Sequence, residues 1–255
     1  MKLAVMQPYF MPYLGYFQAI KAVDKYILYE NLTYILNGWM NRNRIRTRNS
    51  PANFLIVPVN SKSSNSLISN VKIDNTQDWK SKILETITFA YKKSPFFDEL
   101  YPLLQQMFSL SFEYLYDLNA QTIISLCRFL DIETQIKYQN QDYLTMETNL
   151  ILMENGDYSS CEYLLKTKPI KKVARAINMC KIEEADIFIN AIGGQELYNA
   201  EEFKKYNIEL KFIQMNNIVY SQYSKDFIPN LSIIDVLMYN GRNKIIQLLN
   251  EYTLI

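Results

Sequence analysis

The first 30 residues contain two short strand-like runs with one helical pattern between them. Residues 3–6 are apolar and end before Pro8, and residues 25–30 are rich in β-forming side chains. Between residues 15 and 23 the apolar side chains recur at helical spacing. A strand, a helix and a strand in so short a stretch favour a βαβ unit, in which both strands lie parallel in one sheet. The sequence therefore predicts an α/β fold.

Later patterns predict a helical insertion and then a second α/β region. Residues 142–158 show no clear periodicity, so we interpret them as irregular and as the boundary between an N-terminal region, 1–141, and a C-terminal region, 142–255. One continuous domain is the alternative. The other expected elements are a strand at 53–59, a helix at 79–91, two helices within 98–130, a helix at 173–181, a strand at 185–191, a short helix at 203–206, a strand at 210–213, and a helix that starts after Ser232 and ends at Gly241.

The chain has no histidine, the side chain that most often moves protons near neutral pH. A Ser-His-Asp or Cys-His site and any His-ligated metal are therefore excluded. An enzyme with this sequence would use Asp, Glu, Lys, Tyr, Cys, water or the substrate itself. The 27 Lys and Arg residues balance 26 Asp and Glu residues, and a net charge of +1 gives no general attraction to DNA or to an anionic membrane.

Cysteine usage and hydropathy indicate the compartment. Cys127, Cys161 and Cys180 are widely separated and odd in number, which fits neither a disulfide framework nor a zinc site. The N-terminal apolar run is too short, and too soon interrupted by Pro8, for a signal peptide. No apolar run approaches the ~20 residues that cross a bilayer. We therefore expect a cytoplasmic protein without a membrane span.

The loop after the first strand concentrates aromatic residues and prolines. Its candidate residues are Gln7, Tyr9, Tyr13, Gly15 and Tyr16, the last two at the start of the following helix. In open α/β sheets, ligands bind outside the carboxyl ends of the strands, and a helix N-terminus favours phosphate. We therefore predict ligand binding here, against the alternative that these rings only pack beneath the loop.

A second candidate segment contains alternating arginines: Arg42, Arg44, Arg46 and Arg48, with Trp39, Asn41 and Asn43 before and between them. An extended backbone would place all four arginines on one face. Guanidinium groups bind phosphate and carboxylate in bidentate fashion. Arg42 and Arg44 are therefore predicted to contact a diphosphate or a sugar, and a solvated basic edge is the alternative.

Two more candidate segments lie in the C-terminal region: Gly193, Gly194 and Tyr198 after an expected strand, and Tyr220, Gln222, Ser232 and Asp235 before an expected helix. Glycines after a strand either let a ligand approach the backbone or make a tight turn. Ser232 and Asp235 have the spacing of a capping box, so Asp235 is either a helix cap or a reactive carboxylate.

Together these segments resemble the WbqC-like family of bacterial polysaccharide biosynthesis proteins, over most of the chain. The resemblance rests on ordered motifs at residues 6–17, 27–30, 38–45, 193–194, 220–222, 231–235 and 240–241. Two departures stand out. The family commonly has paired Asp residues where this chain has Glu30 and Asn31, and residues 190–192, Asn-Ala-Ile, replace its Ser-Gly-Pro.

The resemblance implies a role in the synthesis of O-antigen, lipopolysaccharide or another surface glycan. It suggests an acyl or aminoacyl transferase that forms an amide on a nucleotide-linked amino-deoxy sugar such as dTDP-4-amino-4,6-dideoxyglucose. The activated donor is open among an ATP-derived adenylate, an aminoacyl-tRNA and an acyl thioester. On this hypothesis Asp235 or Glu30 takes a proton from the amine. The substrate-binding residues are then Gln7, Tyr9, Tyr13, Gly15, Tyr16, Tyr34, Trp39, Asn41, Arg42, Asn43, Arg44, Gly193, Gly194, Tyr198, Tyr220, Gln222 and Ser232.

A weaker likeness concerns residues 13–16, Tyr-Leu-Gly-Tyr, which stand where HIGH-type nucleotidyltransferases have His-x-Gly-His. It implies a distantly similar, Rossmann-like N-terminal sheet and makes a nucleotidyltransferase one alternative function. Another alternative is a non-catalytic module that binds a nucleotide sugar or a partner enzyme of the same pathway. Binding of tRNA through a local basic face, and a homodimer through aromatic surface, are also left open.

Overall fold

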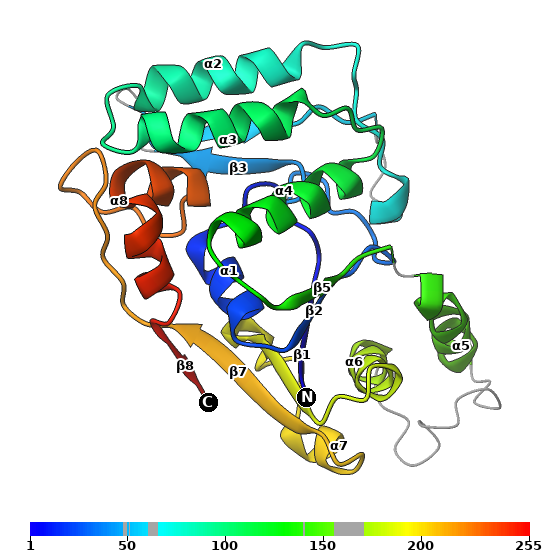
Figure 1. The fold of residues 1–255 in the computed structure, drawn as a ribbon. Coiled ribbons are helices and arrows are strands. Elements are labelled where there is room, and N and C mark those ends of the chain that lie inside the picture. Colours follow the sequence, from blue (N-terminus) through cyan, green and yellow to red (C-terminus); the bar gives the residue numbers. More distant parts are fainter. Residues whose placement is uncertain (48–49, 51, 61–65, 140, 156–170) are drawn as a thin grey trace.

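A computed structural model describes residues 1–47, 50, 52–60, 66–139, 141–155 and 171–255. Its centre is a six-stranded sheet with five parallel strands (Figure 1). The strands lie in the spatial order β5 (Gln135–Lys137), β2 (Lys25–Leu28), β1 (Lys2–Met6), β6 (Ile187–Ala191), β7 (Glu209–Met215) and the antiparallel β8 (Tyr252–Leu254). The parallel strands thus follow the order third, second, first, fourth, fifth along the chain. This is the order of a Rossmann-like sheet and confirms the predicted α/β class.

The predicted βαβ unit is present, with α1 (Leu14–Lys21) between β1 and β2. Leu3 pairs with Lys25 and Met6 with Leu28 in parallel register. Successive side chains of a strand point to opposite faces, so Leu3 and Ala4 enter two different apolar clusters. Both faces of the sheet are buried, which is why its central strands are nearly continuous apolar runs.

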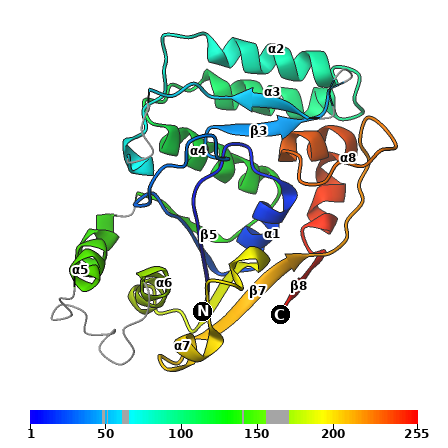
Figure 2. The ribbon, with the colours of Figure 1, turned by 180° about the vertical axis from the view of Figure 1, so that it is seen from behind.

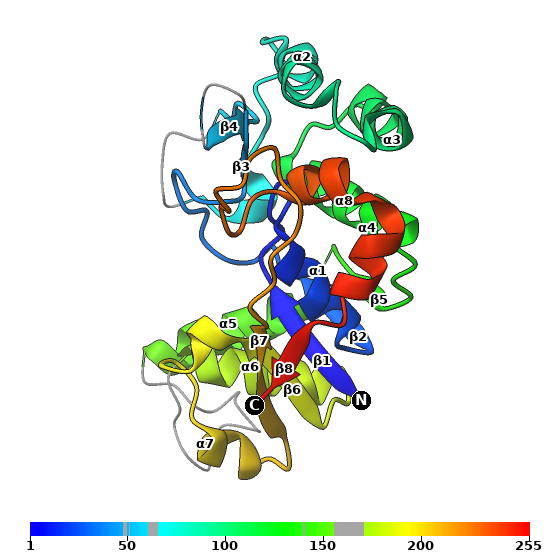
Figure 3. The ribbon, with the colours of Figure 1, turned by 90° about the vertical axis from the view of Figure 1, so that its left-hand side faces the viewer.

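Helices cover both faces of the sheet. The helices α1, α4 (Leu115–Phe129) and α8 (Ile233–Leu248) contribute to the apolar cluster on one face. The helices α5 (Leu144–Glu154), α6 (Lys171–Ile182) and α7 (Ala200–Lys204) lie on the other, and Figures 2 and 3 show the two groups on opposite sides of the strands. Among the described residues, no helix combines the length and apolar character that a membrane span needs.

Between β2 and β5 the chain builds a separate layer beyond the strands (Figure 1). It contains an antiparallel pair, β3 (Arg42–Ile45) and β4 (Asn53–Ile56), the 3-10 turn η1 (Ile68–Asn70), and the helices α2 (Trp79–Tyr91) and α3 (Phe97–Ser109), before α4. Two buried amides attach the loop after β1 to this layer. Asn43 donates to the carbonyls of Phe10 and Met11 at 3.0 and 2.8 Å, and Asn119 donates to those of Pro8 and Met40 at 3.0 and 2.7 Å.

The interpretation of residues 142–158 as irregular is wrong where the structure describes them. The 3-10 turn η2 (Gln141–Tyr143) and α5 occupy residues 141–154, and residues 156–158 lie outside the described part. The apolar residues of α5 are spread around the helix instead of gathering on one face, so no helical periodicity shows in the sequence. The two predicted regions contribute strands to one sheet, because β1 pairs with β6. The boundary at residue 142 stays a prediction.

The first helical stretch of α8 ends at Gly241, as expected, because the backbone there is non-helical, and a second stretch continues beyond this kink to Leu248. Gly241 has φ +68°, a backbone conformation that favours glycine, and a Cβ there would lie 2.4 Å from the Phe96 ring. The strand expected at 53–59 pairs with β3 and stays outside the main sheet. The short strands β5 and β8 were not predicted.

Candidate ligand-binding site

The candidate site lies where the strand order reverses, between β1 and β6. The chain leaves β1 toward α1 on one face and leaves β6 toward α7 on the other, so the connections diverge. In open α/β sheets, ligands bind in the crevice outside the strand ends at this point. Two cavities open there, one on each face of the sheet, and Met6 at the end of β1 lies in the wall of both.

The first cavity, called the basic cavity here, has a volume of about 450 Å³. It opens between the ends of β1 and β6, the loop after β2, and α6. Its lining residues are Val5, Met6, Gln7, Tyr29, Leu32, Thr33, Ile35, Lys172, Arg175, Ala176, Met179, Phe188, Asn190 and Tyr198. The side chains that carry its charge are Lys172 and Arg175, and none of its lining residues in the described part of the chain is Asp or Glu.

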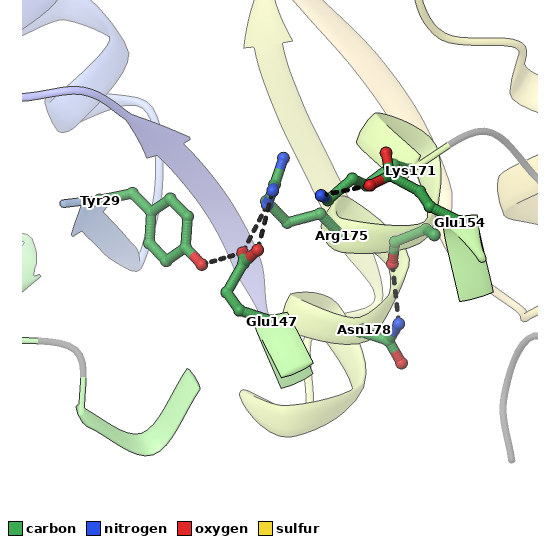
Figure 4. A network of polar contacts seen from close by, with 7 residues as sticks. Tyr29, Glu147, Glu154, Lys171, Arg175 and Asn178 are labelled. Atoms are coloured by element: carbon green, nitrogen blue, oxygen red, sulfur yellow. Dashed lines mark hydrogen bonds and ion pairs between the residues drawn. The ribbon is translucent and has the colours of Figure 1, made fainter. Parts of the chain in front are cut away.

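A polar network behind the wall holds Arg175 in place (Figure 4). Its Nε and Nη2 donate to the two carboxylate oxygens of Glu147 at 2.6 and 2.9 Å, and the Tyr29 hydroxyl donates to the same carboxylate. Burial alone would lower the pKa of Arg175, but Glu147 raises it above its ordinary value. Burial, reinforced by Glu147, also raises the pKa of Tyr29. The guanidinium thus stays charged and the phenol stays protonated at neutral pH.

The basic cavity can bind an anion through Lys172. Glu147 offsets the charge of Arg175, whereas Lys172 is exposed at the rim and pairs with no described residue. The amides of Gln7 and Asn190 stand at the ends of the two strands that flank the crevice. This combination of an ammonium without a partner among the described residues, a fixed guanidinium and two amides suits a phosphate or carboxylate group.

The second cavity, called the tyrosine cavity here, has a volume of about 300 Å³. Its lining residues are Met6, Tyr9, Tyr13, Gly15, Tyr16, Gln18, Ala19, Tyr26, Ala191, Ile192, Ile213, Gln214, Met215 and Asn230. The Tyr9 and Tyr16 ring centroids lie 5.6 Å apart at 46°, and those of Tyr16 and Tyr26 lie 5.6 Å apart at 63°. Burial raises the pKa of each of its four tyrosines, which keeps the phenols uncharged at neutral pH.

The structure brings the first predicted loop and part of the third segment to these cavities. Gln7 and Tyr198 line the basic cavity, and Tyr9, Tyr13, Gly15 and Tyr16 line the tyrosine cavity. Gly193 and Gly194 belong to the 3-10 turn η3 (Ile192–Gly194) after β6. A Cβ at Gly194 would lie 2.2 Å from Asn190 Nδ2, so this glycine leaves room for an amide of the basic cavity. A Cβ at Gly193 would meet no described atom within 4 Å.

The arginine segment lies elsewhere. Arg42 and Arg44 share one face of β3, as the alternation predicts, but neither they nor Trp39 line either cavity. The Arg42 guanidinium lies 4.8 Å from the Phe54 ring centroid, and that of Arg44 lies 5.3 Å from the Trp39 ring. Arg46 turns inward, is buried and donates to the Asp226 carbonyl. Arg48 lies outside the described residues.

The other predicted binding residues of the insertion and of the C-terminal segment lie away from both cavities. The amides mainly bond backbone: Asn41 donates to the Val57 carbonyl at 3.0 Å, and Gln222 donates to the Ile228 carbonyl at 2.7 Å. Tyr34 is buried, and Tyr220 packs edge-on against Phe227 at 5.0 Å between centroids. These contacts are those of side chains that shape loops.

The two predicted catalytic carboxylates are buried and line neither cavity. Asp235 accepts from the Tyr91 hydroxyl at 2.6 Å and from the Arg46 backbone N–H at 3.3 Å. Its burial raises the pKa of the carboxyl to about 6. Ser232 is the N-cap of α8, but the Asp235 carboxylate does not complete a capping box. Glu30 is 6% exposed.

Sequence reasoning missed the residues that give the cavities their polarity, namely Gln18, Tyr26, Tyr29, Lys172, Arg175 and Asn190. The sequence does contain one signal for two of these residues, Lys172 and Arg175. Lys171, Lys172 and Arg175 put three cations into five residues at the start of α6, which begins two residues before the helix expected at 173–181. Lys171 pairs with Glu154 at 2.7 Å (Figure 4), whereas its neighbour Lys172 lines the basic cavity.

The protein has a Rossmann-like α/β fold with a cavity on each side of the strand-order reversal, the place where open α/β sheets bind small molecules. The sequence model of the WbqC-like protein family matches residues 7–247, and the chain belongs to this family. A curated relative from Mycobacterium tuberculosis (strain ATCC 25618 / H37Rv), the uncharacterized protein Rv1507c, is 25% identical over 248 residues, which cover 94% of each chain. No solved structure matches the chain.

Proposed function

We propose that this protein is an acyl or aminoacyl transferase that forms an amide on a nucleotide-linked amino-deoxy sugar, in the synthesis of a bacterial surface glycan such as O-antigen. The observation that carries the proposal is the pair of chemically different cavities that meet at Met6. A diphosphate suits the side with Lys172 and Arg175, and a sugar suits the aromatic side. One two-part molecule that crosses the end of β1 would occupy both.

The reaction joins an amine to an activated acyl carbon. The amine first loses to water the extra proton of its ammonium form; its nitrogen lone pair then attacks that carbon and a C–N bond forms. The bond from the carbon to the leaving group then breaks, and the leaving group departs with the electron pair. The leaving group is a phosphate oxygen of an adenylate, a tRNA ester oxygen or a thiolate, and we assign the amine proton to it because no described lining residue is Asp or Glu. Holding both reactants in position can supply up to about 7–11 kcal/mol of the acceleration.

The structure changes the residues to which we assign the diphosphate. Arg42 and Arg44 are half-buried on the separate β3–β4 layer beside the exposed Trp39 and line neither cavity. Lys172 and Arg175 instead face the crevice at the strand ends, so we assign the diphosphate to them.

The Lys172→Ala variant tests this assignment. Loss of a charge-assisted contact costs about 1.5–3 kcal/mol, so we expect the Kd for dTDP to rise at least tenfold. Calorimetry with wild type and variant measures the change. Lys244→Ala removes an exposed lysine that lines neither cavity and is the matched control. Equal dTDP affinity in wild type and Lys172→Ala would contradict the proposal.

A non-catalytic binding module is the second candidate, and the lack of a described carboxylate in either lining favours it. Turnover distinguishes the two. The transferase consumes one of the three classes of donor and gives an amide that mass spectrometry detects, whereas a binding module binds the nucleotide sugar and consumes no donor.

A further inference from the structure

We infer that the tyrosine cavity recognises the amino group of the sugar and selects an amine over a hydroxyl at that position, through the tyrosine rings and the carbonyl oxygen of Gln18. This inference rests on the proposed function and names the part of the substrate that each cavity takes. The basic cavity takes the anionic nucleotide, and the tyrosine cavity takes the amino sugar.

Gln18 presents an acceptor without a donor. The side chain is fully buried in α1 and lines the tyrosine cavity. Its Nε2 donates to the carbonyls of Leu248 and Glu251 at 2.8 and 3.0 Å, so both amide hydrogens are used. Its Oε1 has no hydrogen-bond partner in the described part of the chain. A buried acceptor left in this state lowers the stability of the fold, and a ligand that donates an N–H to it would recover that loss.

The orientation of this amide is fixed. A flip would bring Oε1 against the carbonyl oxygens of Leu248 and Glu251. An amide oxygen carries no hydrogen and cannot donate to them. The cavity therefore offers an acceptor, not a donor, at this position. A hydroxyl can donate to this one acceptor, but a primary amine or ammonium has two or three N–H groups and can donate to Oε1 and to a tyrosine oxygen at the same time.

The tyrosines add a preference for positive charge. Rings of Tyr9, Tyr16 and Tyr26 meet at angles of 46° and 63°, and aromatic faces attract a cation within about 6 Å. The described lining contains no Lys or Arg that would repel an ammonium and no Asp or Glu that would hold it as an ion pair. Because burial keeps the phenols protonated, their oxygens can also accept from an amine.

The shape of the cavity places this subsite beside the basic cavity. The Tyr16 hydroxyl donates to the Gln7 carbonyl at 2.9 Å, which fixes one ring at the end of β1. The Tyr13 ring lies over Gly15, where a Cβ would come within 2.5 Å of it. Gly15 thus gives Tyr13 the space to form part of the wall.

The experiment uses two sugars without a nucleotide, so that it does not depend on the basic cavity. The probes are the methyl glycoside of 4-amino-4,6-dideoxyglucose and the methyl glycoside of 6-deoxyglucose, which has a hydroxyl at carbon 4. We expect the wild-type protein to bind the amine at least fivefold more tightly in an NMR titration. Tyr9→Leu and Tyr13→Leu should remove this preference, and Tyr9→Phe should keep it because the ring remains.

Tyr223→Leu, at an exposed tyrosine that lines neither cavity, is the matched control and should behave as wild type. Equal binding of the two glycosides by the wild-type protein would overturn the inference even if a variant fails to fold. A titration with dTDP in parallel separates the two proposals. Binding of dTDP without an amine preference would be consistent with the proposed function and would overturn this inference. An amine preference without dTDP binding supports the subsite and contradicts the nucleotide-linked substrate.

Discussion

Asp235 shows how a residue with a reactive sequence signature can have a structural role. Its position before an apolar helix fitted either a cap or a base, and the structure buries it completely. Its carboxylate accepts from Tyr91 on α2 and from the backbone of Arg46 after β3. It therefore joins the start of α8 to two parts of the insertion, at the cost of burying a carboxylate of which one oxygen has no partner among the described residues.

The first prediction concerns the pH dependence of stability at Asp235. The folded-state pKa of about 6 exceeds the ordinary value of 3.8, so the folded state binds the proton more tightly than the unfolded state. The contribution is fully present below pH 3.8 and is lost as pH rises through 6. It amounts to up to about 3 kcal/mol. Urea unfolding between pH 4 and pH 7 should show this loss in wild type and not in Asp235→Asn.

Asp235→Asn also tests the role that the sequence predicted. With a structural Asp235, the folded variant keeps its affinity for dTDP and its turnover at neutral pH. If Asp235 were the base, turnover would disappear while dTDP binding remained. A pH profile of unfolding identical in the two proteins would contradict the raised pKa.

Local sequence pattern identifies some of the residues that line the cavities, whereas the others depend on long-range packing. Tyr9, Tyr13 and Tyr16 were found because they follow an apolar strand, and strand ends face the crevice. Gln18 and Arg175 were not found, because each lies on a helix whose position over the sheet depends on long-range packing. The roles proposed for them depend on their hydrogen-bond partners, Leu248 for Gln18 and Glu147 for Arg175.

Among the elements, β3 attaches the insertion to the candidate site. The Asn43 side chain is buried and donates to two carbonyls of the loop that carries Tyr9 and Tyr13. Asn43→Ala removes two hydrogen bonds at about 1 kcal/mol each and leaves two carbonyls without a donor. We therefore expect the free energy of unfolding to fall by about 2–4 kcal/mol. The loop after β1 should become more mobile in this variant.

Asn41→Ala is the control for this element, because Asn41 is partly exposed and makes one bond to the Val57 carbonyl. We expect it to lose about 1 kcal/mol or less in urea unfolding. Asn43→Ala should in addition weaken binding of the methyl 4-amino-4,6-dideoxyglucoside several-fold, since the tyrosine rings depend on the loop. Equal losses of stability in the two variants would contradict the role of Asn43.

Strong local periodicity made most elements predictable, and its absence explains the errors. The helices α2 and α4 have an apolar face that repeats along the sequence, and β1, α1 and β2 are bounded by turns. The strands β5 and β8 have three residues each, too few to define a pattern. The helix α5 is apolar on several sides, so its sequence fits neither the pattern of an amphipathic helix nor that of an alternating strand.

At the scale of the whole molecule, the strand order sets the position of the candidate site. β1 pairs with β2, near in sequence, and with β6, more than 180 residues away. The sequence predicts that both are strands, but nothing in their residues states that they are neighbours. The crevice between them, and with it the site, follows from this pairing. The predicted loop after β1 lines both cavities, and Tyr198 on the opposite wall was also among the predicted residues, whereas Asn190 of β6 and the cations of α6 were not.

The central claim is that one nucleotide-linked amino sugar spans both cavities, and its most direct test is calorimetry with dTDP-4-amino-4,6-dideoxyglucose. We expect Lys172→Ala and Tyr13→Leu each to weaken this ligand at least fivefold. We expect dTDP alone to be weakened only by Lys172→Ala, and the methyl amino glycoside only by Tyr13→Leu. Wild-type affinity for the full ligand in both variants would contradict the claim.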